Sequence, residues 1–191
     1  MDTRRRWVFG AFLVLAGAGL WMFVVAPILG PSQRTWQAQI ELDSVPLTQA
    51  LRYDVRLERV SQFDAAWAKR RVLYDEAHLA DLRERLLTFV DFQVAEYADA
   101  KQIYLAGSRP ETPSAAASAV HQRLAVAFPG EAATWISQFK QNVREAAYTA
   151  SPAVAHDVDP DLPKYDSIYD DVVTKWLPKA KARVAELTRS P

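Results

Sequence analysis

The sequence predicts an all-α protein, in which one N-terminal transmembrane helix is followed by an irregular bundle of four or five helices. An uncharged, apolar run covers residues 7–29. Behind it, apolar residues recur at intervals of three or four, as they do on one face of a helix. No segment of useful length alternates between apolar and polar residues as a half-buried strand does.

The apolar run is long enough to cross a membrane. Its 23 residues would form a helix about 34 Å long, and a hydrocarbon core is about 30 Å thick. The run follows Arg4, Arg5 and Arg6, which the positive-inside rule keeps in the cytoplasm. We therefore expect an uncleaved anchor in a bacterial inner membrane. The expected segments are a cytoplasmic N-terminus (1–6), the transmembrane anchor (7–29), a juxtamembrane linker (30–45) and a helical periplasmic domain (46–191).

A cleaved signal peptide is the alternative interpretation of this run. Cleavage after Ala26 would leave Pro27 next to the cut, and the run exceeds the roughly 7–15 apolar residues of a signal core. Both features favour the anchor, and Trp7 suits the membrane interface. Gly10 and Gly17 share a helix face that would admit another membrane helix, although small residues are also common in membrane helices generally.

Two helices are predicted between residues 44 and 106. Ser44 before Pro46 is typical of a helix start, and this first helix would turn Leu47, Leu51, Val55, Phe63 and Trp67 inward. The second would span 75–106, about 48 Å, between Asp75 at its positive N-terminal end and Gly107 at its C-terminal stop. Its buried stripe would consist of Leu79, Leu82, Leu86, Phe89, Val90, Val94, Tyr97 and Tyr104.

Three further helices follow a loop at residues 107–113. Thr112 is expected to cap the first of them, which would run to Phe128 before the break at Pro129 and Gly130. The other two would cover 131–150 and 166–188, separated by the long connection 151–163. Pro178 should kink or divide the last helix because proline lacks a backbone donor.

The composition excludes several classes of function. The chain has 23 basic and 23 acidic residues, and removing Arg4, Arg5, Arg6 and Asp2 leaves 20 and 22, a charge of about −2 for the exported part. This balance offers no basic face for nucleic acid. With no cysteine, the chain cannot attach haem covalently, hold an iron–sulfur cluster or carry a thiol redox centre.

No metal or cofactor is predicted. His78, His121 and His156 lie on separate predicted segments, without the spacing of three or four that metal ligands on one helix share. Asp157, Asp159 and Asp161 begin like a calcium loop, but Leu162 and Ile168 occupy the positions of its glycine and its final glutamate. Turn formation and helix capping are therefore the favoured roles of these aspartates. A weak calcium site completed from another loop is the alternative.

Opposite charges mark a candidate interaction surface. Its basic residues are Arg52, Arg56 and Arg59 on one face of the first helix, followed by Lys69, Arg70 and Arg71. Its acidic residues are Asp157, Asp159 and Asp161. The two sets would meet each other, a partner subunit or anionic headgroups, whereas solvated helix faces are the simpler interpretation.

Because no local sequence motif indicates a catalytic site, we do not expect an enzyme. The expected function is that of an accessory, assembly or scaffold subunit of a membrane complex, whose partners are the lipid bilayer and other membrane or periplasmic proteins. A domain that senses or binds a small ligand is the first alternative. An enzyme with a site assembled from scattered residues is the second.

Overall fold

The computed structural model describes residues 33–54, 61–109, 112–155 and 162–190. The predicted anchor, including Arg4, Arg5, Arg6, Trp7, Gly10 and Gly17, lies outside these residues. Within them, none of the helices combines the length and the apolar character that a membrane span requires. The chain divides into two compact units, Met1–Gln39 and Ile40–Pro191, and the description below concerns the second.

The described residues are helical and contain no strand, which confirms the all-α prediction. The α-helices are α3 (Gln33–Gln49), α4 (Ser61–Arg71), α5 (Glu76–Ala106), α6 (Ala115–Ala127), α7 (Ala132–Phe139), α8 (Glu145–Thr149), α9 (Tyr165–Asp171) and α10 (Leu177–Leu187). A π-helical turn, Lys140–Arg144, joins α7 to α8, and another, Val172–Trp176, joins α9 to α10. The described part therefore holds six continuous helices, where we expected four or five.

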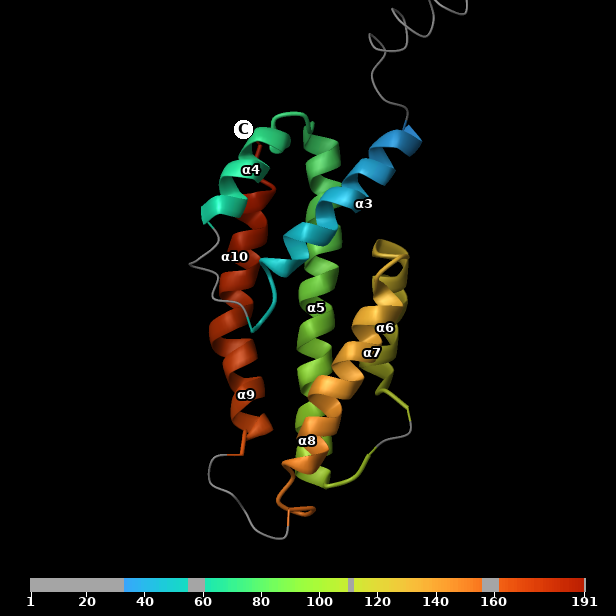
Figure 1. Ribbon diagram of the computed structural model, residues 1–191, viewed down its shortest axis with the longest axis vertical. Coiled ribbons are helices and arrows are strands. Elements are labelled where there is room, and N and C mark those ends of the chain that lie inside the picture. Colours follow the sequence, from blue (N-terminus) through green and yellow to red (C-terminus); the bar gives the residue numbers. More distant parts are fainter. Residues whose placement is uncertain (1–32, 55–60, 110–111, 156–161, 191) are drawn as a thin grey trace, which may run out of the picture. The chain divides into compact units, whose positions relative to one another are not determined.

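Helix α5 is the centre of the bundle (Figure 1), with α6, α7 and α8 on one side of it and α9 and α10 on the other. Its largest side chains fill the core: Leu82, Leu86 and Phe92 are completely buried. Near its C-terminal end, Ala100 and Ile103 pack with Ala147, Ala150 and Tyr165 from the helices on both sides. The predicted long helix is thus the element on which the others are assembled.

Both predicted ends of α5 are confirmed. Asp75 is the N-cap, and its carboxylate accepts a hydrogen bond from the backbone N–H of His78 at 2.8 Å. Gly107 ends the helix in the left-handed region, with φ at 60°, and its N–H donates to the carbonyl of Ile103 at 2.9 Å. This conformation is one that residues with a Cβ rarely adopt.

Replacing Gly107 with alanine is expected to lower the free energy of unfolding by at least about 1 kcal/mol. The new Cβ would be strained at this φ and would overlap the side chain of Ala153. Gly130→Ala is the matched control, because a Cβ there meets nothing within 4 Å. Urea unfolding followed by circular dichroism checks this pair. Equal midpoints for the two variants would contradict the assigned role of Gly107.

The predicted first helix is wrong. Ser44 does not begin a helix but lies inside α3, where its hydroxyl donates to the carbonyl of Glu41 at 2.8 Å, and Pro46 also lies inside α3. The helix ends at Gln49, and α4 is a separate helix. A side chain distant in sequence holds the turn between them: the Gln93 amide donates to the carbonyl of Leu51 at 3.0 Å and accepts from the N–H of Tyr53 at 2.9 Å.

The predicted cap of α6 is displaced by two residues. Ser114, not Thr112, is the N-cap, and its hydroxyl accepts from the N–H of Ala117 at 3.1 Å. Asp99 of α5 selects this serine, because its carboxylate accepts hydrogen bonds from both the hydroxyl and the N–H of Ser114, at 2.6 and 3.2 Å. The predicted inward residues of this helix, Val120, Leu124 and Phe128, are buried as expected.

The two C-terminal helical segments each contain a π turn that the sequence did not indicate. In the last segment, the N–H of Leu177 bonds to the carbonyl of Val172, five residues back, directly before Pro178. The wide turn lets the helix continue past a residue without a backbone donor. The π turn therefore joins α9 and α10 into one continuous helix, which Pro178 does not divide.

Candidate functional site

The basic residues of the predicted interaction surface lie in different surroundings. Arg52 lies in the turn after α3 rather than on a helix, so the expected shared helix face is wrong for this residue. Its guanidinium pairs with Asp54, at 3.0 Å from Nε to Oδ1. Arg56 and Arg59 lie outside the described residues.

The other three basic residues form the last turn of α4. Arg70 pairs with the buried carboxylate of Asp43 at 2.7 Å, and Arg71 donates to the carbonyl of Glu186 at 3.0 Å. Lys69 is exposed. Two of these side chains therefore stabilise the bundle itself. The acidic residues Asp157, Asp159 and Asp161, together with His156, lie outside the described residues.

A buried cluster of charged side chains lies where α5, α6 and the first π turn meet. We name Glu96, Asp99, His121, Arg144 and Ser114 the central polar cluster. Glu96 is completely buried in the middle of α5, and Asp99 lies one turn further along the same helix. The side chain of Arg144 is 11% exposed and that of His121 is 13% exposed.

Short contacts connect the whole cluster. Arg144 bridges the two carboxylates: its Nε lies 3.0 Å from Oε2 of Glu96, and its NH2 donates to Oδ2 of Asp99 at 2.9 Å. The Nε2 of His121 lies 2.5 Å from Oε1 of Glu96. Asp99 also binds Ser114, the N-cap of α6. One arginine and one histidine thus face two buried carboxylates.

The π turn and the aromatic core position this cluster. Arg144 is the last residue of the π turn, and the wider turn changes the direction of the side chains that follow along the helix. The ring of His121 packs against Phe92, 5.8 Å between centroids, and Phe92 packs edge-on against Phe139 at 5.0 Å. The polar contacts are therefore enclosed by aromatic side chains from the same helices.

Chemically, this arrangement cross-links helices and holds charge in the interior. Each carboxylate of the cluster is bonded to a cationic or hydroxyl group within the fold. Among the described residues, no group of three or more histidine, cysteine, aspartate or glutamate side chains is placed to hold a metal ion. His78 is separate from the cluster and pairs with Asp75, 2.7 Å between Nδ1 and Oδ1.

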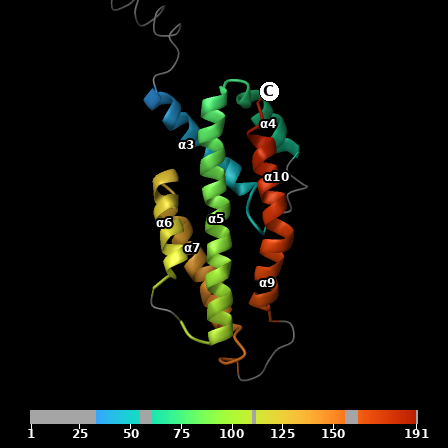
Figure 2. The ribbon, with the colours of Figure 1, turned by 180° about the vertical axis from the view of Figure 1, so that it is seen from behind.

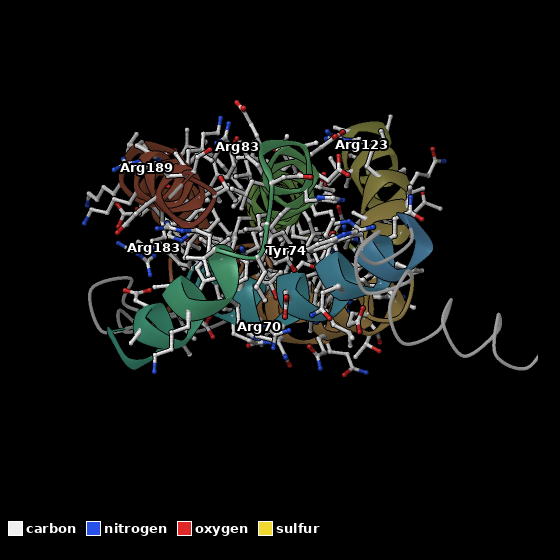
Figure 3. All side chains as sticks on the ribbon, turned by 90° about the horizontal axis from the view of Figure 1, so that it is seen from above. Arg70, Tyr74, Arg83, Arg123, Arg183 and Arg189 are labelled. Atoms are coloured by element: carbon white, nitrogen blue, oxygen red, sulfur yellow. The ribbon has the colours of Figure 1, made fainter. Side chains whose placement is uncertain are left out.

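A second set of polar contacts closes the C-terminal end of α10. Its last carbonyls accept hydrogen bonds from three directions: Trp67 donates to Leu187 at 2.8 Å, Arg71 to Glu186 and Arg83 to Thr188 at 3.1 Å. Figure 3 looks onto this end of the bundle, with Arg83 and Arg183 labelled. Arg183 pairs with Asp64 of α4 and with Glu186. Cationic donors suit the negative end of a helix, so these residues cap α10.

Two tyrosines, the buried Tyr74 and the half-buried Tyr97, predict how the stability of the fold changes in alkali. Burial raises the pKa of the Tyr97 hydroxyl above its ordinary value near 10. Burial and a 2.6 Å hydrogen bond to Asp43 raise the pKa of Tyr74. The unfolded chain therefore loses these protons first. Their contribution to stability is complete below about pH 10 and is lost as the pH rises further.

We expect the free energy of unfolding to fall more steeply above pH 10 in the parent protein than in a Tyr74→Phe, Tyr97→Phe double variant. Urea unfolding between pH 8 and 11 measures this difference. Parallel pH profiles would show that the two hydroxyls do not titrate differently in the folded and unfolded states.

The comparisons with known proteins give no relative for this arrangement. No protein-family model matches the chain, and neither the search of curated proteins nor that of solved structures found a match.

Proposed function

We propose that the chain is a single-pass inner-membrane protein whose periplasmic helical domain binds other proteins, as an accessory, assembly or scaffold subunit of a membrane complex. The observation that carries the proposal is a partly exposed stripe along α5. It consists of Leu87, Asp91, Val94, Ala98 and Leu105, which we name the open stripe. The spacing of three, four or seven residues places them on one side of the helix.

Two charged side chains on this face of α5 are held in position by neighbouring helices. Asp91 contacts Arg123 of α6 at 3.4 Å, and Lys101 contacts Asp170 of α9 at 3.1 Å and lies over the ring of Tyr169. Seen from behind (Figure 2), α5 lies in front, between α6 on one side and α9 and α10 on the other. A helix face that presents apolar and small side chains, interrupted by charges already paired within the bundle, suits a partner helix with a largely apolar face.

Site-specific photocrosslinking of the full-length protein in membranes tests this proposal. A benzophenone amino acid at Val94 should capture one defined neighbour, and the same group at Ala133, an exposed position on α7, should not. Capture at Val94 should disappear when Ala98 is replaced by glutamate, because a charge would then face the partner's apolar surface. Circular dichroism must show that this variant keeps its helices.

Capture that is equal at both positions, or that Ala98→Glu leaves unchanged, would overturn the open stripe as a binding surface. A monomeric protein in mild detergent, with no crosslinked neighbour in cells, would overturn the proposed function as a whole.

A further inference from the structure

The outer face of α5 has the spacing of a helix–helix contact. Six residues follow one another at intervals of four, three, four, three and four, and we name them the α5 seam: Leu87, Asp91, Val94, Ala98, Lys101 and Leu105. The a and d positions of a coiled coil recur at the same intervals. All six side chains are at least partly exposed, and Leu105 is 58% exposed. This face of α5 therefore has the form that one helix presents to another.

The order of residues in the α5 seam is self-complementary. Counted inward from its two ends, the seam pairs Leu87 with Leu105, Asp91 with Lys101, and Val94 with Ala98. In a two-fold symmetric contact, a residue and its opposite number exchange the same contact twice, so these are the pairs that meet when two copies of α5 pack antiparallel. A parallel pair would instead place each charge beside its own copy, and like charges repel.

The two charges of the α5 seam are paired within their own chain in a way that leaves room for a second partner. Arg123 lies 3.4 Å from Oδ2 of Asp91, whose side chain is 41% exposed. Lys101 lies 3.1 Å from Asp170, and an ammonium group has two further donors. In an antiparallel pair, Lys101 of the second copy would approach Asp91 and complete a row of alternating charge. The charges therefore favour this arrangement.

We propose that a second copy of the chain covers the open stripe, in an antiparallel homodimer whose two-fold axis crosses α5 midway between Val94 and Ala98. This inference rests on the proposed function, because it names the partner of the same surface. Leucines meet at both ends of the contact, and a larger side chain meets a smaller one at its centre. Each pair occurs twice in a two-fold contact, so each substitution acts twice.

Because the chain has no cysteine, introduced cysteines report the direction of pairing. The full-length protein in mild detergent carries Leu87→Cys and Leu105→Cys, together or separately, and is mildly oxidised. In the antiparallel dimer these two positions meet across the seam. Two copies of one position lie 18 residues apart, about 27 Å, which is too far for a disulfide. We expect several-fold more disulfide-linked dimer from the double variant than from either single variant.

A charge exchange separates the contact between copies from the ion pairs within one chain. Asp91→Lys brings cations together at two places and should weaken dimerisation roughly tenfold, measured by sedimentation equilibrium. Adding Lys101→Asp should restore it, although this double variant faces Arg123 and Asp170 with like charges inside the chain. A role within one chain predicts the opposite order. Arg123→Met, which breaks only an internal pair, should change dimerisation less than about threefold.

The outcomes distinguish failure of the homodimer from failure of the proposed function. Equal disulfide-linked dimer from Leu105→Cys alone and from the double cysteine variant would overturn the antiparallel arrangement, as would failure of Lys101→Asp to rescue Asp91→Lys. A monomeric chain whose photocrosslinker at Val94 captures a different protein would overturn the homodimer and leave the proposed function standing. A monomer that captures no neighbour would overturn both.

Discussion

Replacing Arg144 with methionine is expected to lower the free energy of unfolding by about 3–5 kcal/mol, the usual cost of leaving buried charges unpaired. The variant keeps the length of the side chain but leaves Glu96 and Asp99 without the guanidinium that bridges them. Because small domains are stable by only about 5–15 kcal/mol, this is a large share of the total. Urea unfolding in detergent, followed by circular dichroism, measures the loss.

Two controls distinguish the effect of unpairing buried charges from the effect of removing any charge. Arg123→Met removes an exposed pair, whose side chains are 57% and 41% exposed, and should cost less than about 1 kcal/mol. Adding Glu96→Gln to Arg144→Met should cost less than the sum of the single changes, because the second change removes the charge that the first left unpaired. Strictly additive losses would show that the two side chains do not act as a unit.

Replacing Phe92 with alanine is expected to cost about 3–5 kcal/mol through the cavity that it leaves. The ring is completely buried and contacts Phe139, His121 and Phe89, with centroid distances of 5.0, 5.8 and 6.2 Å. Its removal would also loosen the aromatic enclosure of the central polar cluster. Thermal and urea unfolding measure the effect.

Val126→Ala is the matched control for Phe92→Ala. Val126 is 82% exposed on α6, and its truncation should change stability by no more than about 0.5 kcal/mol. If Phe92→Ala were tolerated as well as Val126→Ala, the packing described around α5 would be wrong.

Local signals predicted α5 and the all-α class well. Asp75 and Gly107 are recognisable caps, and most of the predicted stripe from Leu79 to Tyr104 is buried. Val94 and Tyr97 are exceptions, because both are only half-buried. The turn after α3 carries no comparable signal, because Gln93, 40 residues away from Tyr53, holds it. The cap at Ser114 likewise depends on Asp99. Contacts between residues far apart in the sequence determine these two features, so local propensity could not predict them.

The sequence contains an indication of the central polar cluster that our prediction did not use. Gln93 and Glu96 occupy positions where the apolar stripe of α5 should continue, between Phe89 and Ala100. A charged residue at such a position is buried and must be paired, so it predicts a partner on another helix. Which residue provides that partner depended on the π turn that carries Arg144, and no pattern in the sequence indicates this turn.

The paired charges also change the interpretation of the basic surface. Arg70 and Arg71 were candidates for contact with a partner or with headgroups, yet both make bonds within the bundle. The surface that we propose for contact with a partner is therefore the open stripe of α5 and not these arginines. The proposed function requires the domain to be held at a membrane.

Alkaline carbonate extraction of membranes from cells that produce the untagged full-length chain tests that requirement most directly. We predict that the protein stays in the membrane pellet and that its intact mass includes the apolar run at residues 7–29. Recovery in the carbonate supernatant, with a mass that begins after Ala26, would contradict the account.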